Sequence, residues 1–152
     1  MYMKISFLII VCFIGISFSQ VFDSLPNQKF TPGDIAFVPD SILCKRGYTT
    51  SVRHVTKKMK HQVRYWYKIS DTIPTGTFEI DHLVALELGG TNSTKNLWPQ
   101  PYAGKWGARV KDVLENKLHR MVCKGEISLE QAQKEIMINW IEAYKKYVRK
   151  EP

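Results

Sequence analysis

Asp81 and His82 stand side by side at the end of the short β-prone run 77–80, and these two side chains could do chemistry together. A neutral imidazole can take a proton from water near pH 7, because the ordinary pKa of histidine is about 6.5. A carboxylate oxygen is the kind of ligand that a hard divalent cation prefers. Adjacent residues of an extended strand point to opposite faces, so we expect the strand to bend or end here. The pair thus offers the two groups that metal-assisted hydrolysis needs, a general base in His82 and a cation ligand in Asp81, but an Asp-His dipeptide by itself is no evidence for that reaction.

The residues that follow predict a strand–loop–strand–helix unit that would position this pair. An apolar segment, 83–88, leads into the turn Gly89-Gly90-Thr91-Asn92-Ser93. A second short strand is expected over Asn96-Leu-Trp-Pro99, stopped by Pro99 and Pro101. A helix is then expected over about 105–124, because Gly125 suits the position just past a helix end.

Both C-terminal helices are expected to bury one apolar face. The second of them begins at the capping-box pattern Ser128-Leu-Glu-Gln131. Residues three and four apart share a helix face, so the spacing of apolar residues predicts which side packs. The predicted inner face of the first helix consists of Val110, Val113, Leu114, Leu118, Met121 and Val122. The predicted stripe of the second consists of Ile136, Trp140, Ile141, Tyr144 and Tyr147.

The stretch from Phe78 to Pro99 resembles the HNH (ββα-metal) endonuclease family, in which an Asp-His pair is followed by an apolar stretch, a Gly-Gly turn and an Asn-Leu pair. Residues 111–140 also resemble a branch of small exported HNH-like proteins, through Lys111-Asp112, Glu115, Leu118-His119, Val122-Cys123 and Gly125. The resemblance covers roughly residues 43–145, and its specific part is 81–99. It implies an α+β single domain with a small ββα-metal motif embedded among helices, and metal-dependent hydrolysis of phosphodiester bonds.

The resemblance also implies roles for three residues of this unit. His82 would activate the attacking water, and Asp81 would bind the metal. Asn96 matches the middle asparagine of the family, whose amide would hydrogen-bond the loop backbone and hold His82 in place. Asn92 is a competing candidate for that position, but it has the setting of an ordinary turn residue.

The third family position, normally a His or Asn on the helix that binds the metal, departs from the pattern here. No His or Asn lies at the usual short distance after Asn96. At 100° per residue, Asp112, Glu115 and His119 lie within about 60° of one another on the helix. A carboxylate could supply the second ligand, with Asp112 ranked before Glu115, whereas His119 is interpreted as a surface partner of Glu115. The implied cofactor is Mg2+, with Mn2+ as the alternative.

Residues 41–70 carry eight Lys and Arg side chains, two His and no acidic residue. A helical stripe with Thr50 or Ser51 as N-cap is expected here, formed by Val52, Val55, Met59, Val63 and Trp66. The basic side chains would then lie outside, either as a plain solvated face or as a surface that tracks phosphates, and we favour the second. Contacts with nucleic acid are predicted for Arg53, Lys57, Lys60 and Arg64, together with Lys111.

The first residues resemble a secretory signal, since Lys4 precedes the uncharged apolar run 5–18 and Ser17 and Ser19 suit signal peptidase. We expect the mature chain to begin near Gln20, in a secreted or periplasmic location. Two cysteines would remain, and in an oxidising compartment they predict one Cys44–Cys123 disulfide. It would close a loop of about 80 residues and stabilise the fold by roughly 4 kcal/mol.

The sequence therefore predicts a signal peptide (1–19), an N-terminal arm with a basic helix (20–74), a nuclease core (75–125) and a C-terminal helix (126–152). The predicted function is secreted, metal-dependent endonucleolytic cleavage of DNA, and of RNA as a further substrate, with low sequence specificity. The net charge of +8 suits such polyanionic partners. We expect a monomer without stable membrane association; an inhibitor protein is left undetermined. The alternatives are a catalytically inactive HNH-like nucleic-acid-binding protein and a basic secreted polyanion-binding protein.

Overall fold

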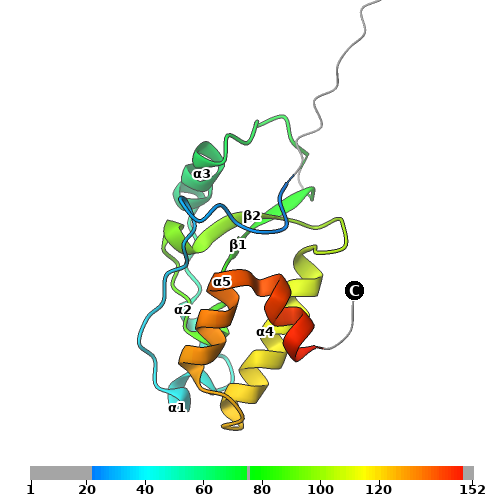
Figure 1. Ribbon diagram of the computed structural model, residues 1–152. Helices are drawn as coiled ribbons and strands as arrows, with labels where there is room; N and C mark the ends of the chain where they lie inside the picture. The colour runs from blue at the N-terminus through cyan, green and yellow to red at the C-terminus, as the bar shows by residue number, and fades with distance from the viewer. Residues whose placement is uncertain (1–21, 75, 149–152) are drawn as a thin grey trace, which may run out of the picture.

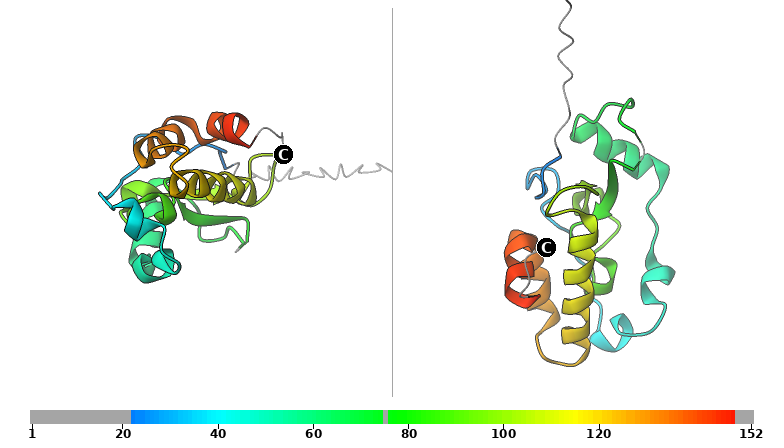
Figure 2. Two further views of the ribbon diagram at one scale, coloured as in Figure 1. Left: turned by 90° about the horizontal axis from the view of Figure 1, so that it is seen from below. Right: turned by 90° about the vertical axis from the view of Figure 1, so that its right-hand side faces the viewer.

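The computed structural model describes residues 22–74 and 76–148, so the predicted signal peptide lies outside the described residues. Helices α4 (Ala108–Cys123) and α5 (Leu129–Tyr147) pack side by side near the C-terminus. Turning the molecule shows α5 on one side of α4, with the strands and α2 on the other (Figures 1 and 2). The apolar core lies between these layers and includes Leu83, Trp98, Leu118 and Trp140.

Strands β1 (Phe78–His82) and β2 (Leu97–Pro101) form an antiparallel pair, in which Asp81 lies opposite Trp98 and His82 opposite Leu97. The connecting loop contains two short 3₁₀ turns, η1 (Leu86–Leu88) and η2 (Thr94–Asn96). The predicted stop at Pro99 is wrong, because β2 continues through it to Pro101. In a two-stranded sheet each strand has one unpaired side, so a proline is tolerated there. Among the described residues the fold is thus a small α+β domain, with a strand pair followed by helices.

The basic segment forms two helices where one was predicted. Helix α2 spans Tyr48–Val52 and α3 spans Lys57–Trp66, after the short α1 (Asp40–Leu43). The chain is extended at Arg53, and α3 begins only after Thr56, whose side chain accepts a hydrogen bond from the Met59 N–H. The break has a tertiary cause: the Val52 carbonyl and the His54 N–H, which a continuous helix would use internally, both bond to the side chain of Asn92.

The inner face of α4 is rotated from the predicted one. Leu114, Leu118 and Val122 are buried as expected, but Val113 is 48% exposed. Lys111 and Glu115 take part in the buried face instead. Apolar periodicity alone misplaces the face, because two polar side chains, Lys111 and Glu115, bond to one another inside.

The turn between α4 and α5 contains the predicted helix end at Gly125 and the predicted N-cap at Ser128. Gly125 adopts a positive φ of 71° just past α4, and the Ser128 side chain accepts a hydrogen bond from the Gln131 N–H at the start of α5. Helix α5 is kinked at Asn139, whose backbone is extended and whose side chain accepts hydrogen bonds from the N–H groups of Ile141 and Glu142. Asn139 therefore acts as an N-cap within the helix.

The sulfur atoms of Cys44 and Cys123 lie 1.92 Å apart, at disulfide distance, as the sequence predicts. They join the end of α1 to the last turn of α4. Within 22–74 and 76–148, no helix has both the length and the apolar character needed to cross a bilayer.

Candidate active site

His82 ends strand β1, and its side chain is almost entirely buried. Its Nε2 lies 3.3 Å from Oδ1 of Asn92. The Asn92 amide is fixed by two further bonds: Nδ2 donates to the Val52 carbonyl at 2.8 Å, and Oδ1 accepts from the His54 N–H at 3.1 Å. Because an amide oxygen only accepts, Nε2 of His82 carries the proton in this bond. The lone pair of a neutral His82 is then on Nδ1, which is the nitrogen able to take a proton.

Asp81 precedes His82 and is the more exposed of the two, with 21% of its side chain accessible. Its Oδ1 lies 3.9 Å from Nδ1 of His82, and its Oδ2 lies 3.5 Å from Nζ of Lys111. Burial alone would raise the pKa of Asp81, but the Lys111 ammonium and the backbone N–H of His82 outweigh it and hold the pKa well below its usual range. Asp81 is therefore an anion beside the basic nitrogen of His82.

Lys111 is fully buried, which contradicts its predicted contact with phosphate. Its ammonium donates to the His82 carbonyl at 2.6 Å and to Oε1 of Glu115, and it faces Asp81. An ammonium has three donors, and these three oxygens account for all of them. Lys111 thus ties helix α4 to the end of β1, directly behind the Asp81–His82 pair.

One ammonium cannot neutralise two buried carboxylates, so the two acids in contact with Lys111 differ in charge. Burial raises the pKa of Glu115 to about 8, against the opposing influence of Lys111. Asp81, the more accessible acid, keeps the negative charge. Near pH 7 the group of three therefore has a single ion pair, Lys111 with Asp81, and a largely protonated Glu115.

Asn96 is completely buried and holds the loop between the strands. Its Oδ1 accepts from the Val84 N–H at 2.9 Å, and its Nδ2 donates to the carbonyls of Val84 and Thr91, both at 2.9 Å. The amide thus bonds the loop backbone as the sequence reasoning expected, while the direct contact with the His82 ring comes from Asn92. The turn chemistry around Asn92 gave no signal for that contact, because it depends on α2 lying nearby.

Gly90 is required by the close approach of this loop to itself. A Cβ atom at Gly90 would lie 1.8 Å from the Val84 carbonyl oxygen and 2.9 Å from Nδ2 of Asn96. Any side chain at Gly90 would therefore push the Val84 carbonyl away from the Asn96 amide that donates to it. The second glycine of the Gly-Gly turn thus has a packing reason.

The three predicted metal ligands differ in how well they fit a divalent cation. Asp81 fits, because it is ionised and its Oδ1 is directed away from Lys111. Glu115 does not fit, because it is buried, largely protonated and in contact with Lys111. Asp112 is exposed on α4, and its pKa is raised by partial desolvation and then by the nearby charge of Asp81. Mg2+ is commonly held by one or two carboxylates with water and phosphate oxygens completing its shell, so among the three predicted ligands Asp81 fits that role best.

The basic segment lies next to this centre. Arg53, Lys57 and Lys60 are exposed. Arg64 is engaged within the fold, because its guanidinium donates to the Ser70 carbonyl at 2.8 Å and lies over the ring of Phe78. The bonds from Asn92 to residues 52 and 54 connect the start of this segment to His82. Asn92 therefore joins the backbone on either side of Arg53 to the candidate base.

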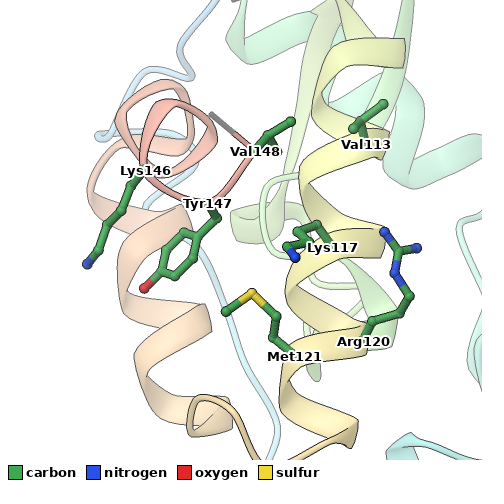
Figure 3. A pocket seen from close by; sticks show the side chains of 7 residues that line it. All are labelled: Val113, Lys117, Arg120, Met121, Lys146, Tyr147 and Val148. Carbon is green, nitrogen blue, oxygen red and sulfur yellow. The ribbon is translucent and has the colours of Figure 1, made fainter. Parts of the chain in front are cut away.

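A hollow lined in part by basic side chains lies between α4 and the end of α5 (Figure 3). None of the predicted site residues lines it. Its walls are Val113, Lys117, Arg120, Met121, Lys146, Tyr147 and Val148. It provides positive charge without a carboxylate or an imidazole, so it offers no hydrolytic chemistry.

No protein-family model, curated protein or solved structure matches the chain. Any inference about function therefore rests on the sequence and on the geometry of this site.

Proposed function

We propose that this protein is a secreted endonuclease that hydrolyses phosphodiester bonds in DNA, and also in RNA, with low sequence specificity. The observation that supports this most is the state of His82. The ring is buried at a strand end, Nε2 is committed to Asn92, and Nδ1 lies beside an ionised Asp81. An imidazole with Nε2 committed to an amide oxygen and Nδ1 left without a hydrogen-bond partner among the described residues is suited to taking a proton from water.

The residues around His82 have supporting roles in this proposal. Asp81 stabilises the imidazolium that forms and offers a carboxylate oxygen for Mg2+ or Mn2+. Lys111 fixes the backbone of His82 and keeps Asp81 ionised. A divalent cation bound at Asp81 would stabilise negative charge on the phosphate and on the leaving oxygen.

The exposed cations Arg53, Lys57 and Lys60 would bind the nucleic-acid backbone close to His82. Phosphate contacts provide affinity but carry no sequence information, which is why we expect low specificity. The apparent affinity should accordingly fall steeply as the salt concentration rises.

The proposal is tested by nicking of supercoiled plasmid by the purified protein with Mg2+ or Mn2+. We expect cleavage that EDTA abolishes and that His82→Ala lowers by about 10²–10⁴-fold, the usual contribution of a general base. His119→Ala is the matched histidine control, because the ring contacts Cys123 and Glu87 and not Asp81 or His82, and it should cleave like the wild type. Binding of plasmid without cleavage, by folded protein with several metals, would favour the inactive nucleic-acid-binding alternative. Binding of heparin and plasmid alike without cleavage would favour the polyanion binder.

A further inference from the structure

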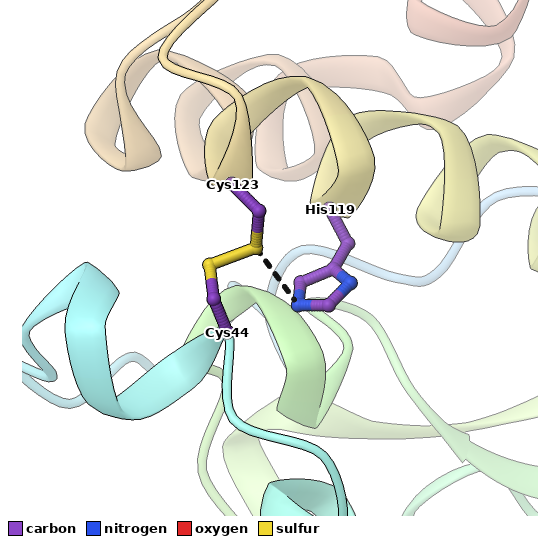
Figure 4. Close-up of side chains that lie close together, drawn as sticks. All are labelled: Cys44, His119 and Cys123. Carbon is purple, nitrogen blue, oxygen red and sulfur yellow. Dashed lines mark hydrogen bonds between the residues drawn. A yellow bond between two sulfur atoms is a disulfide. The ribbon is translucent and has the colours of Figure 1, made fainter.

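The Cys44–Cys123 bridge and the neighbouring His119 form a second group of side chains that can bind metal, and this group shares no residue with the Asp81–His82 centre. His119 lies one helical turn before Cys123 on α4, so the two side chains share a face. Nε2 of His119 lies 3.4 Å from Sγ of Cys123, and the ring faces the bridge (Figure 4). One donor atom from each of Cys44, His119 and Cys123 lies within 4.8 Å of the other two. Among the residues that the structure describes, no other group of three His, Cys or acidic side chains brings its donor atoms this close together.

The His119 ring is also oriented from its other side. Its Nδ1 lies 4.0 Å from Oε2 of Glu87, on the η1 turn. In the disulfide form Sγ of Cys123 has no hydrogen, so Nε2 is the donor in that contact. After reduction, a proton held on Nδ1 by the Glu87 carboxylate would leave the lone pair of Nε2 for a metal ion. Histidines that bind metals usually have such a carboxylate or carbonyl on the far nitrogen. Two cysteines at the ends of α1 and α4 and an oriented imidazole thus form a donor set that suits zinc.

We propose that when the Cys44–Cys123 disulfide is reduced, Cys44, Cys123 and His119 bind one Zn2+ ion. A dithiol reductant breaks the S–S bond by giving two electrons and two protons, and is itself oxidised to a disulfide. Zinc then binds both sulfurs as thiolates, and the two thiol protons pass to solvent. Zinc undergoes no redox change, and a water molecule completes the tetrahedral shell on the exposed side of Cys123.

Little movement is needed to convert one arrangement into the other. With Zn–S of about 2.3 Å and Zn–N of about 2.0 Å, a tetrahedral site places sulfur and nitrogen roughly 3.6 Å apart. The Cys123–His119 separation is already 3.4 Å. The two sulfurs must move apart to about 3.8 Å, which the exposed Cys123 side chain permits. The same corner of the fold would therefore be joined by a disulfide in an oxidising compartment and by zinc in a reducing one.

Cobalt titration of the reduced protein tests this directly, because Co2+ reports its own ligands by absorption. The protein, reduced by a phosphine with oxygen excluded, should develop a thiolate-to-cobalt charge-transfer band and the visible bands of a tetrahedral site. The bands should saturate at one Co2+ per chain and disappear on addition of Zn2+. The oxidised protein should show neither band. His119→Ala should weaken binding by more than ~100-fold and Glu87→Gln by about 10-fold, the range found when a metal-bound histidine loses its partner. His61→Ala, an exposed histidine on α3, is the control and should bind like the wild type.

Circular dichroism of the reduced, metal-free protein covers the case in which loss of the disulfide unfolds the chain. There, Zn2+ should restore the helical signal of the wild type and fail to restore that of His119→Ala. The proposal is overturned if the reduced wild type shows no charge-transfer band. It is equally overturned if His119→Ala binds Co2+ as tightly as the wild type, because the histidine would then not be a ligand. Neither result bears on the nuclease activity of the oxidised protein.

Discussion

Replacing Lys111 by methionine tests the central electrostatic feature of the candidate site. Methionine keeps most of the side-chain length but removes the ammonium. Asp81 would remain ionised in a mostly buried position without its cation, and the His82 carbonyl would lose its 2.6 Å hydrogen bond. Removing one partner of a buried ion pair typically costs about 3–5 kcal/mol of unfolding free energy, because the other charge is left uncompensated. We expect Lys111→Met to be destabilised by that amount.

The same reasoning separates the two acids that contact Lys111. Because burial raises the pKa of Glu115 to about 8, its carboxyl is largely neutral at pH 7, and Glu115→Gln replaces one neutral group by another. That variant should be at least as stable as the wild type at pH 7, because unfolding releases a proton from Glu115 and so favours the unfolded wild type, whereas glutamine has no proton to release. Adding Asp81→Asn to Lys111→Met should recover about 1–3 kcal/mol, because it removes the uncompensated charge.

Urea unfolding followed by circular dichroism at pH 7 measures the wild type and the three variants on one scale. A Lys111→Met protein within 1 kcal/mol of the wild type would refute the buried ion pair. A Glu115→Gln protein as unstable as Lys111→Met would show that Glu115, and not Asp81, carries the charge that Lys111 neutralises. Either result would also remove the basis for treating Asp81 as the ionised partner of His82.

Three further measurements test other parts of the site. The folded-state pKa of Glu115, about 8, lies above its ordinary value of 4.5, so between these values the folded protein holds a proton that the unfolded chain releases. The stability of the wild type relative to Glu115→Gln should therefore be greatest below pH 4.5 and fall as the pH rises to 8. Urea unfolding across that range measures it. Asn92→Ala should leave the chain folded but lower plasmid nicking by about 10-fold or more, and 15N shifts of the His82 ring should show the Nε2–H tautomer in the wild type and a mixture in the variant; an unchanged tautomer would contradict the role of Asn92. Gly90→Ala should fail to fold or melt far below the wild type, because its Cβ would meet the Val84 carbonyl, whereas Gly104→Ala, which faces open space at a positive φ, should lose only about 1 kcal/mol, with thermal unfolding as the measure.

The sequence by itself determined the features that depend on neighbours in the chain. The helix after Ser128, the end of α4 at Gly125 and the two strands around the Gly-Gly turn all follow from capping and periodicity, which act over a few residues. The Cys44–Cys123 pairing followed from having only two cysteines in the predicted mature chain. The bonding of the Asn96 amide to the loop was also expected, from the resemblance of its motif.

Only the tertiary structure decided which polar side chains are buried and which partners they bond. From its spacing in the sequence, Lys111 would be exposed beside Asp112. It is buried because Asp81, on strand β1, and Glu115, one turn later on its own helix, bond its ammonium group. Asn92 looks like a turn residue until residues 52–54 lie against it, and that contact also breaks the helix which periodicity predicted. The physical reason is the same in both cases. A polar side chain takes its role from the partner that satisfies it after folding, and such partners can lie tens of residues away in the chain.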